Sequence, residues 1–338
     1  MLKLFALSVG LLIAVSTPTL AQDGVASAPE ASKVLSQESI NAADLASIPV
    51  QYSAEVEQLA PDPAIVRLQI LLDRAGASPG VIDGFDGENV RKAILAFEAL
   101  NGLPEDGTLN ADVLARLGAA PVVGAYTISD DDTKDVTGPT PADYAEKARM
   151  DYLGYATVAE AVAERFHMDI DLLTELNPGA TYAVGEQILV SAPGSPVSEA
   201  KVARIVADKG LRQVRAYDEL GNLIVAYPAT IGSEDNPSPS GSHVVEGVAT
   251  MPNYTYNPTI NFQQGENAEV LTIPPGPNGP VGSIWIDLSE PTYGIHGTPE
   301  PSLIDKTGSH GCVRLTNWDA EELAKMVSPG VMVDFIDG

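Results

Sequence analysis

The one cysteine of this chain lies among residues that support nucleophilic chemistry. Cys312 belongs to the segment GSHGCVRLTNWD, with His310 two residues before it and Arg314 two residues after it. A second histidine, His296, lies sixteen residues before the cysteine in the segment YGIHGT. Because a free thiol is mostly protonated near neutral pH, a nucleophilic cysteine needs a base or a positive environment. The two histidines offer both.

The compartment decides what a lone thiol can do. A basic residue near the start, an apolar run from Leu4 to Val15 and small residues at the end are typical of a cleaved signal peptide over residues 1–21. A membrane anchor is the alternative, but the run is shorter than the ~20 residues that span a bilayer. We therefore expect export. One cysteine cannot close an internal disulfide, so Cys312 either pairs with another chain or is a free reactive thiol.

The loop around the cysteine suits acyl-transfer chemistry. Gly311 permits a sharp turn that can point backbone N–H groups at one place, where they would stabilise an oxyanion. Immediately downstream, Thr316 or Asn317 is a good N-cap for an amphipathic helix that contains Trp318. The sequence thus predicts a reactive loop braced by the start of a helix.

Two other interpretations of the cysteine are weaker. Zinc would need the set His296, His310 and Cys312 with His243 or Asp305, but two ligands only two residues apart are tightly spaced for one tetrahedral ion. A buried structural thiol would prefer a more apolar surrounding than Gly, Ser, His and Arg provide. We favour nucleophilic catalysis and expect no metal or cofactor.

The whole chain has 338 residues and a formal charge of −27. This charge argues against nucleic-acid binding, and the length suggests two or three domains. Residues 22–60 are small, polar and weakly periodic, which predicts a disordered linker. Residues 200–337 carry short strand patterns and dense Gly and Pro, which predict a mostly-β domain with long loops.

Residues 61–120 predict a small three-helix bundle, because apolar residues recur at helical spacing on both sides of SPGVIDGFDGENV. Asp83, Asp86 and Glu88 in that loop lack the spacing of an EF-hand, so turn chemistry is favoured over calcium. The segment resembles a peptidoglycan-binding-domain-1-like module, including its turn at Asp83-Gly84-Phe85-Asp86-Gly87. The resemblance implies binding to the cell wall.

Residues 121–194 predict a strand, an acidic insertion, two helices and a second strand. The pattern resembles an α+β LysM-like module, with Asn177-Pro178 and Gly185-Glu186-Gln187-Ile188 at the matching landmarks. No second metal ligand stands near His167, so we expect a packed or capping histidine.

The segment YGIHGTPEPSLIDKTGSHGCVRLTNWD resembles the signature of the L,D-transpeptidase (YkuD-like) catalytic domain. The resemblance implies that Cys312 is the nucleophile and His296 its base, with the Gly297 carbonyl orienting the imidazole. It further implies oxyanion donors at His310, Gly311 and Cys312, and a donor-substrate site shaped by Ser309 and Arg314.

By this resemblance the protein is a multidomain peptidoglycan L,D-transpeptidase of the periplasm. Cys312 would form a thioester with a tetrapeptide stem and transfer the acyl group to an amine. The acceptor stays open: another stem, or an outer-membrane protein or lipoprotein to be anchored. Two alternatives remain: an L,D-carboxypeptidase, in which water resolves the thioester, and a non-catalytic wall-binding adaptor.

Overall fold

The computed structural model describes residues 34–50, 58–192, 194, 200–233 and 235–337. The chain divides into two units, Met1–Ser32 and Lys33–Gly338, and every described residue belongs to the second. The predicted signal peptide therefore lies outside the described residues. Among the residues that are described, no helix has both the length and the apolar character needed to cross a membrane.

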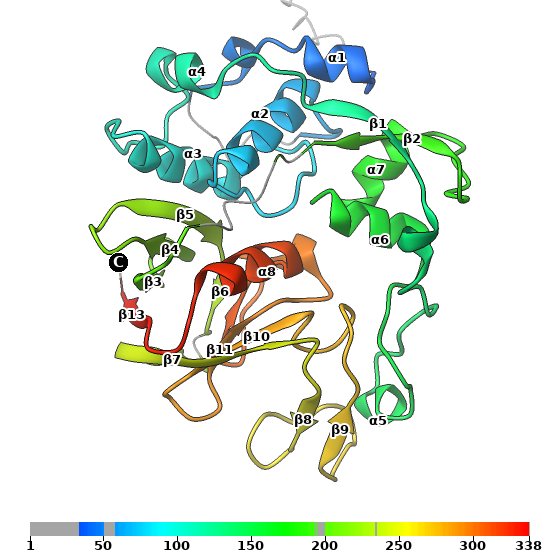
Figure 1. The fold of residues 1–338 in the computed structure, drawn as a ribbon, viewed down its shortest axis with the longest axis vertical. Helices are drawn as coiled ribbons and strands as arrows, with labels where there is room; N and C mark the ends of the chain where they lie inside the picture. Colours follow the sequence, from blue (N-terminus) through cyan, green and yellow to red (C-terminus); the bar gives the residue numbers. More distant parts are fainter. Residues whose placement is uncertain (1–33, 51–57, 193, 195–199, 234, 338) are drawn as a thin grey trace, which may run out of the picture. The chain divides into compact units, whose positions relative to one another are not determined.

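The first part of the described chain is helical (Figure 1). Its elements are α1 (Gln37–Asn41), η1 (Leu45–Ser47), α2 (Pro63–Arg74), α3 (Glu88–Leu100) and α4 (Ala111–Leu117). The three helices predicted between residues 61 and 120 are α2, α3 and α4. Asp62 and Asn110 start α2 and α4 by accepting hydrogen bonds from first-turn amides, as good N-caps do.

The predicted linker over residues 22–60 is wrong for residues 34–50. This segment contains α1 and η1, and Ile40, Leu45 and Ile48 are buried in the hydrophobic core of the helical region. The Asn41 side chain also exchanges hydrogen bonds with the backbone of Val123. Burial against distant residues orders a segment whose own composition predicts no structure.

The second part has the predicted order of strand, insertion, two helices and strand. Its elements are β1 (Val123–Thr127), η2 (Asp130–Thr133), α5 (Tyr144–Lys147), α6 (Val158–Arg165), α7 (Ile170–Leu176) and β2 (Gln187–Ser191). Strands β1 and β2 pair antiparallel, from Val123↔Ser191 to Thr127↔Gln187. The helical region and this βααβ region share one hydrophobic core, which includes residues from Ile40 to Val190. Neither region therefore has a core of its own.

The C-terminal part is mostly β. It contains β3 (Arg204–Asp208), β4 (Gln213–Tyr217), β5 (Leu223–Pro228), β6 (Thr230–Ile231), β7 (Gly241–Thr250), β8 (Tyr254–Tyr256), β9 (Leu271–Ile273), β10 (Ile284–Leu288), β11 (Gly294–His296), η3 (Pro301–Leu303), β12 (Val313–Arg314), α8 (Asn317–Met326) and β13 (Met332–Ile336). The predicted hairpin turn at DELGN joins β4 to β5, where Asp218 accepts hydrogen bonds from two turn amides.

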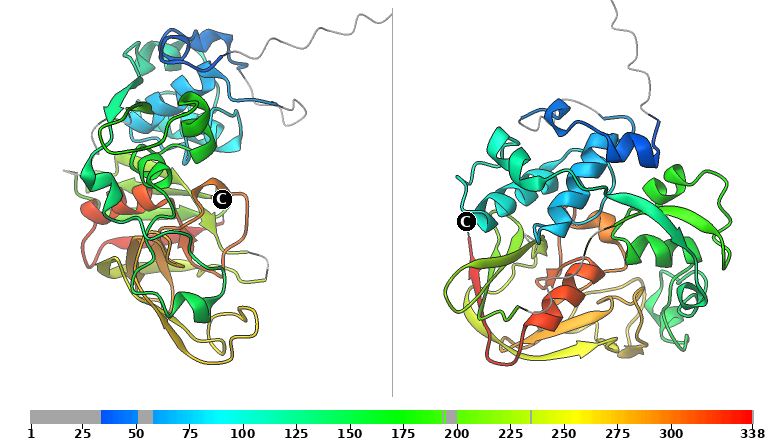
Figure 2. Two further views of the ribbon diagram at one scale, coloured as in Figure 1. Left: turned by 90° about the vertical axis from the view of Figure 1, so that its right-hand side faces the viewer. Right: turned by 45° about the horizontal axis from the view of Figure 1, so that its top comes forward.

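Nine of these strands form one mixed sheet in the order β5-β4-β3-β13-β7-β10-β11-β12-β6. The two ends of this order, β5 and β6, are separated in the chain by Ala229 alone, so the sheet curls into a barrel-like form. Helix α8 packs on β10 and β11, as Figures 1 and 2 both show. A separate core under the sheet and α8 includes Ile286, Val313 and Leu323.

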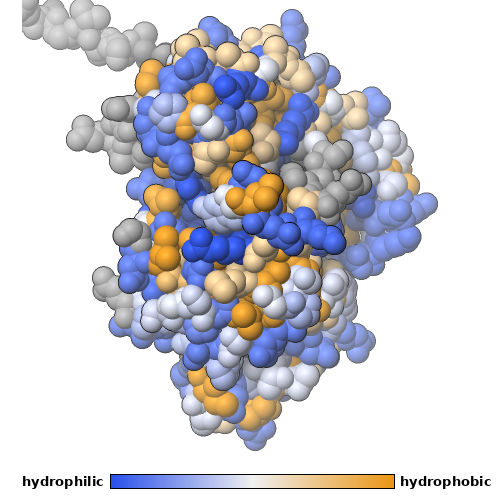
Figure 3. Space-filling view, turned by 60° about the vertical axis from the view of Figure 1, so that its left-hand side comes forward, coloured by the Kyte–Doolittle hydropathy of each residue, from blue (hydrophilic) through white to orange (hydrophobic). Residues whose placement is uncertain are grey.

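The N-terminal regions pack against the C-terminal part at several places, two of which are a backbone bridge and a small core. Ala77, just after α2, forms a parallel bridge with Ala226 of β5, and hydrogen bonds of 2.9 Å link their neighbouring backbones. The insertion after β1 packs against the β8–β9 hairpin, where Leu153, Tyr256 and Ile273 form a small third core. On the outside, Figure 3 shows hydrophilic side chains surrounding small groups of hydrophobic ones.

Candidate active site

The fold brings His296, Cys312 and Arg314 to one place. Strands β11 and β12 are adjacent and parallel, with His296 opposite Arg314 in the register. Cys312 comes just before β12, two residues from Arg314. Side chains two apart along an extended chain point to the same face of a sheet, and neighbouring strands lie about 4.8 Å apart. The three predicted residues therefore share a face.

His296 has a buried and neutral imidazole. Its Nδ1 lies 2.6 Å from the Gly297 carbonyl oxygen. A carbonyl can only accept, so Nδ1 carries the proton and Nε2 keeps its lone pair. Burial, helped by the Arg314 charge, lowers the pKa of His296 to about 4. The Trp285 ring stacks on the imidazole at 5.7 Å between ring centroids and fixes its plane.

The backbone that holds this imidazole is packed against Asn317, the first residue of α8. A Cβ added at Gly297 would lie 2.1 Å from Asn317 Oδ1, so only glycine fits at this approach. The same Oδ1 accepts a hydrogen bond from the Ser283 amide at 3.0 Å. The sequence predicted Thr316 or Asn317 as the N-cap. Thr316 is the cap, and Asn317 instead supports the histidine loop.

The Cys312 thiol rests against a backbone carbonyl. Its Sγ lies 3.7 Å from the Thr292 oxygen, and no hydrogen bond joins it to His296 among the described residues. Burial raises the pKa of the thiol, while the Gly294 amide and the Arg314 charge act in the opposite direction. The resting site thus holds a protonated thiol and a neutral imidazole.

The loop before the cysteine is held by serine hydroxyls. Ser309 Oγ accepts from the Gly232 amide at 2.8 Å and donates to the Cys312 carbonyl at 2.6 Å. Gly311 has φ of 102° and its carbonyl accepts from Ser238 Oγ at 2.6 Å, so the predicted sharp turn is present. The buried hydroxyl of Ser309 serves the loop backbone, and a direct contact with substrate stays a prediction.

His310 and Arg314 flank Cys312 in the sequence, two residues to either side. In the described part of the chain the half-buried Arg314 guanidinium forms no ion pair or hydrogen bond, and burial lowers its pKa. The exposed His310 ring stacks on Phe262 with 4.0 Å between centroids. Phe262 in turn packs edge-on against Tyr144 of α5, so the insertion reaches an aromatic wall beside the site. No sequence pattern pointed to this wall.

The residues considered for zinc binding, for calcium binding and as a lone histidine ligand have other partners in the structure. Asp305 pairs with Lys92 and Arg212, and His243 lies beside Glu290, so the suggested zinc set is not brought together. Asp83 accepts from the Phe85 amide and the Gln69 side chain, which is the predicted turn chemistry. His167 stacks on Trp318 and pairs with Asp73, as expected for a packed histidine.

A lone thiol beside a neutral imidazole and a glycine turn is the constellation of enzymes with a cysteine nucleophile. Comparison with known proteins gives the particular family. Residues 202–334 match the L,D-transpeptidase catalytic domain (YkuD), and residues 61–117 match a putative peptidoglycan binding domain. The chain belongs to the L,D-transpeptidase family.

Two curated relatives carry this assignment. The putative L,D-transpeptidase YkuD of Bacillus licheniformis is 32% identical over 177 residues, which are 52% of this chain and 90% of the relative. The probable L,D-transpeptidase YbiS of Escherichia coli is 27% identical over 212 residues, covering 60% of this chain and 69% of the relative.

Solved structures of the same family are also similar. An L,D-transpeptidase from Xylanimonas cellulosilytica is 15% identical with a TM-score of 0.36, covering 83% of this chain and 97% of that chain. An L,D-transpeptidase from Mycobacterium smegmatis is 21% identical with a TM-score of 0.33, covering 46% of this chain and 64% of that chain. The family model and the curated relatives, rather than these superpositions, support the assignment.

Proposed function

We propose that this protein is a peptidoglycan L,D-transpeptidase in which Cys312 attacks a tetrapeptide stem and transfers the acyl group to an amine. The observation that carries the proposal is the neutral imidazole of His296, held by the Gly297 carbonyl on the face that also bears Cys312. A base that stays unprotonated in its buried pocket is ready to accept the thiol proton.

The first half-reaction forms a thioester. His296 Nε2 takes the proton from Cys312 Sγ as sulfur bonds to the carbonyl carbon between the L- and D-centres of the stem. Backbone amides of the His310, Gly311 and Cys312 turn would stabilise the oxyanion. The C–N bond then breaks, the proton on His296 passes to the leaving amine, and the terminal D-alanine departs. Cys312 is left as the thioester.

The second half-reaction restores the enzyme. An acceptor amine attacks the thioester, His296 takes a proton from that amine, and the C–S bond breaks with the proton returning to sulfur. The acceptor is a side-chain amine of a neighbouring stem, or the terminus of an outer-membrane protein or lipoprotein that is to be anchored. Water in place of the amine would make the protein an L,D-carboxypeptidase.

Arg314 is the proposed anchor for the anionic stem. Its half-buried guanidinium has no ion pair among the described residues, and arginine binds carboxylates through paired N–H donors. A carboxylate of the donor stem would supply the missing partner. Ser309 contributes indirectly by fixing the loop from which the amides point.

The N-terminal regions would hold the enzyme on its insoluble substrate. Residues 61–117 match a putative peptidoglycan binding domain, and we propose that the LysM-like βααβ region adds a second glycan contact. Attachment raises the effective concentration of stems near Cys312. This function places the protein outside the cytoplasm, in the periplasm and at the wall.

The test is the analysis of muropeptides after incubation of purified sacculi with the full chain. New cross-links through the third residue of the stem would support transpeptidation, whereas stems shortened without cross-links would assign the carboxypeptidase. A carbapenem should acylate the wild-type thiol and leave Cys312→Ser unlabelled. Unchanged muropeptides together with an unlabelled wild-type protein would refute the proposal, and retained sedimentation with sacculi would then favour the adaptor.

A further inference from the structure

Asn317 connects the histidine loop to the N-terminal half of the protein. It is 1% exposed, and both ends of its side-chain amide are engaged. Oδ1 accepts from the Ser283 amide and touches the backbone at Gly297, as described above. Nδ2 donates to the Pro277 carbonyl at 3.2 Å and to Glu164 Oε1 at 2.8 Å. These partners define which way the amide faces.

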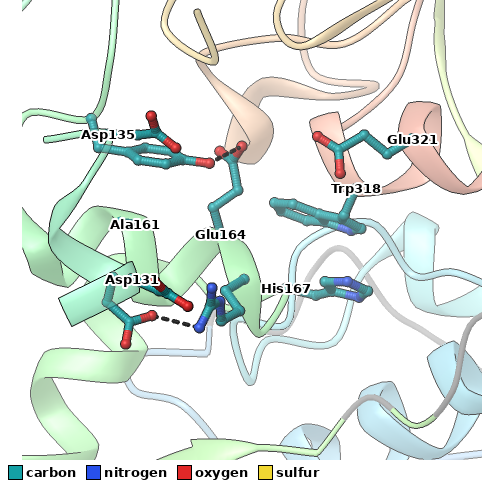
Figure 4. A pocket seen from close by; sticks show the side chains of 10 residues that line it. Asp131, Asp135, Ala161, Glu164, His167, Trp318 and Glu321 are labelled. Carbon is teal, nitrogen blue, oxygen red and sulfur yellow. Dashed lines mark hydrogen bonds and ion pairs between the residues drawn. The ribbon is translucent and has the colours of Figure 1, made fainter. Parts of the chain in front are cut away.

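Glu164 comes from α6 of the βααβ region, 153 residues away in the chain. Its Oε1 also accepts from the Tyr155 hydroxyl at 3.1 Å. Figure 4 shows Glu164 extending from α6 at the wall of a cavity of about 300 Å³ that Trp318 and Glu321 also line. The Tyr155 hydroxyl therefore fixes the Glu164 oxygen that accepts from Asn317, and both Tyr155 and Glu164 belong to the βααβ region.

This carboxyl group is enclosed even though the side chain as a whole is only partly buried. Its desolvation raises the pKa of Glu164 to about 8, so the group is mostly protonated at neutral pH. A neutral carboxyl still accepts through one oxygen. The contact with Asn317 thus depends on an acceptor at this position and does not need a charge.

We propose that Glu164 is a positioning residue for His296. Glu164 orients the Asn317 amide, Asn317 supports the backbone at Gly297 and Ser283, and the Gly297 carbonyl sets the imidazole tautomer and plane. The proposal rests on the function proposed above, in which His296 is the base. It assigns the βααβ region a part in the chemistry, in addition to any part in wall attachment.

The test compares three variants of the full chain by the rate and the half-saturation of carbapenem acylation. Glu164→Leu removes the acceptor and leaves one N–H of the Asn317 side-chain amide unpaired. Because small misplacements of a reacting group are costly, we expect the saturated rate to fall about 10- to 100-fold, with the half-saturating concentration within about threefold of wild type. Glu164→Gln keeps an acceptor oxygen and should stay within about threefold in rate. Glu175→Leu, an exposed carboxylate on α7, is the matched control.

A second variant covers the case in which Glu164→Leu does not fold. Asn317→Asp keeps the shape and the acceptor for Ser283, but it places two carboxyl groups at the present 2.8 Å contact. Such a pair is fully protonated at low pH, shares one proton over an intermediate range and repels when both groups ionise. The acylation rate of Asn317→Asp should therefore fall at least tenfold, relative to wild type, between neutral and alkaline pH.

The outcomes of these measurements distinguish a failure of this inference from a failure of the proposed function. If Cys312→Ser and His296→Gln lose acylation but folded Glu164→Leu reacts like wild type, the inference alone is overturned. Equal losses in Glu164→Gln and Glu164→Leu would also overturn it, because the acceptor would then not be what matters. A wild-type pH profile for Asn317→Asp would have the same meaning. Full acylation of His296→Gln would instead remove the proposed function.

Discussion

The depressed pKa of His296 makes a quantitative prediction for the pH dependence of acylation. Burial lowers the pKa from about 6.5 to about 4, which corresponds to about 3 kcal/mol against charging the imidazole. At pH 5.5 an ordinary histidine would be roughly 90% protonated, whereas His296 would be only about 3% protonated. The base therefore stays available well below neutral pH, while the raised pKa of Cys312 keeps the thiol protonated.

The assay is the rate of carbapenem adduct formation, followed by mass spectrometry between pH 4.5 and 9 at constant ionic strength. The rate should be nearly flat from pH 5.5 to 8 and should decline only as the pH approaches 4. His296→Gln should react about 100-fold more slowly or worse, the usual contribution of a general base. Its remaining rate should rise with the thiolate fraction toward alkaline pH.

Folding must be monitored in the same series because the pKa shift also affects stability. The unfolded chain binds a proton at His296 between pH 6.5 and 4 while the native chain does not, so stability falls as the pH is lowered through this range. Circular dichroism at each pH identifies loss of fold. A folded wild-type protein whose acylation rate is halved near pH 6.5 would refute the neutral-base mechanism.

Three further predictions concern stability. Gly297→Ala should lower the free energy of unfolding in urea by about 1–3 kcal/mol, because the new Cβ would clash with the Asn317 side chain. Gly247→Ala, with open space around it, should not produce such a clash, and equal effects of the two substitutions would contradict the close approach. The free energy of unfolding of Glu164→Gln should increase relative to that of wild type as the pH rises from 4.5 to 8, by at most about 5 kcal/mol. The reason is that the native Glu164 carboxyl holds a proton that the unfolded carboxyl releases. A difference in unfolding free energy that does not change with pH would refute the shifted pKa. Ile40→Ala should cost about 2–5 kcal/mol in the same urea assay and Val34→Ala almost nothing, since Ile40 is fully buried and Val34 is exposed; a neutral Ile40→Ala would mean that α1 does not pack on the core.

Cys312 and His296 could be singled out from the sequence because the information about them is local. Cys312 and His296 lie in short segments whose Gly, Ser and His residues already suggest a turn and a base. Parallel pairing of β11 with β12 then places them on one face. The strands and helices of the C-terminal part were predictable for the same reason, since alternation and capping signals span only a few residues.

The supporting contacts could not be predicted in this way. Asparagine is a residue type favoured at helix N-caps, so the sequence suggests that role for Asn317. No neighbouring residue in the sequence indicates its hydrogen bond to Glu164. Residues 34–50 likewise lack a periodic apolar pattern, yet Ile40 is buried because Asn41 ties the segment to β1. Such features depend on pairings between distant parts of the chain, which residue type and spacing do not encode.

The bridge between Ala77 and Ala226 has a consequence for how the parts of this protein can be recombined. Strand β5 ends the nine-stranded sheet, and the residues after α2 occupy hydrogen-bonding groups on its outer side. A bare strand of this kind invites pairing with another molecule. Grafting the C-terminal part onto a foreign module without an equivalent of Gly76 to Ser78 should yield a chain prone to self-association, so the two parts are best inherited together.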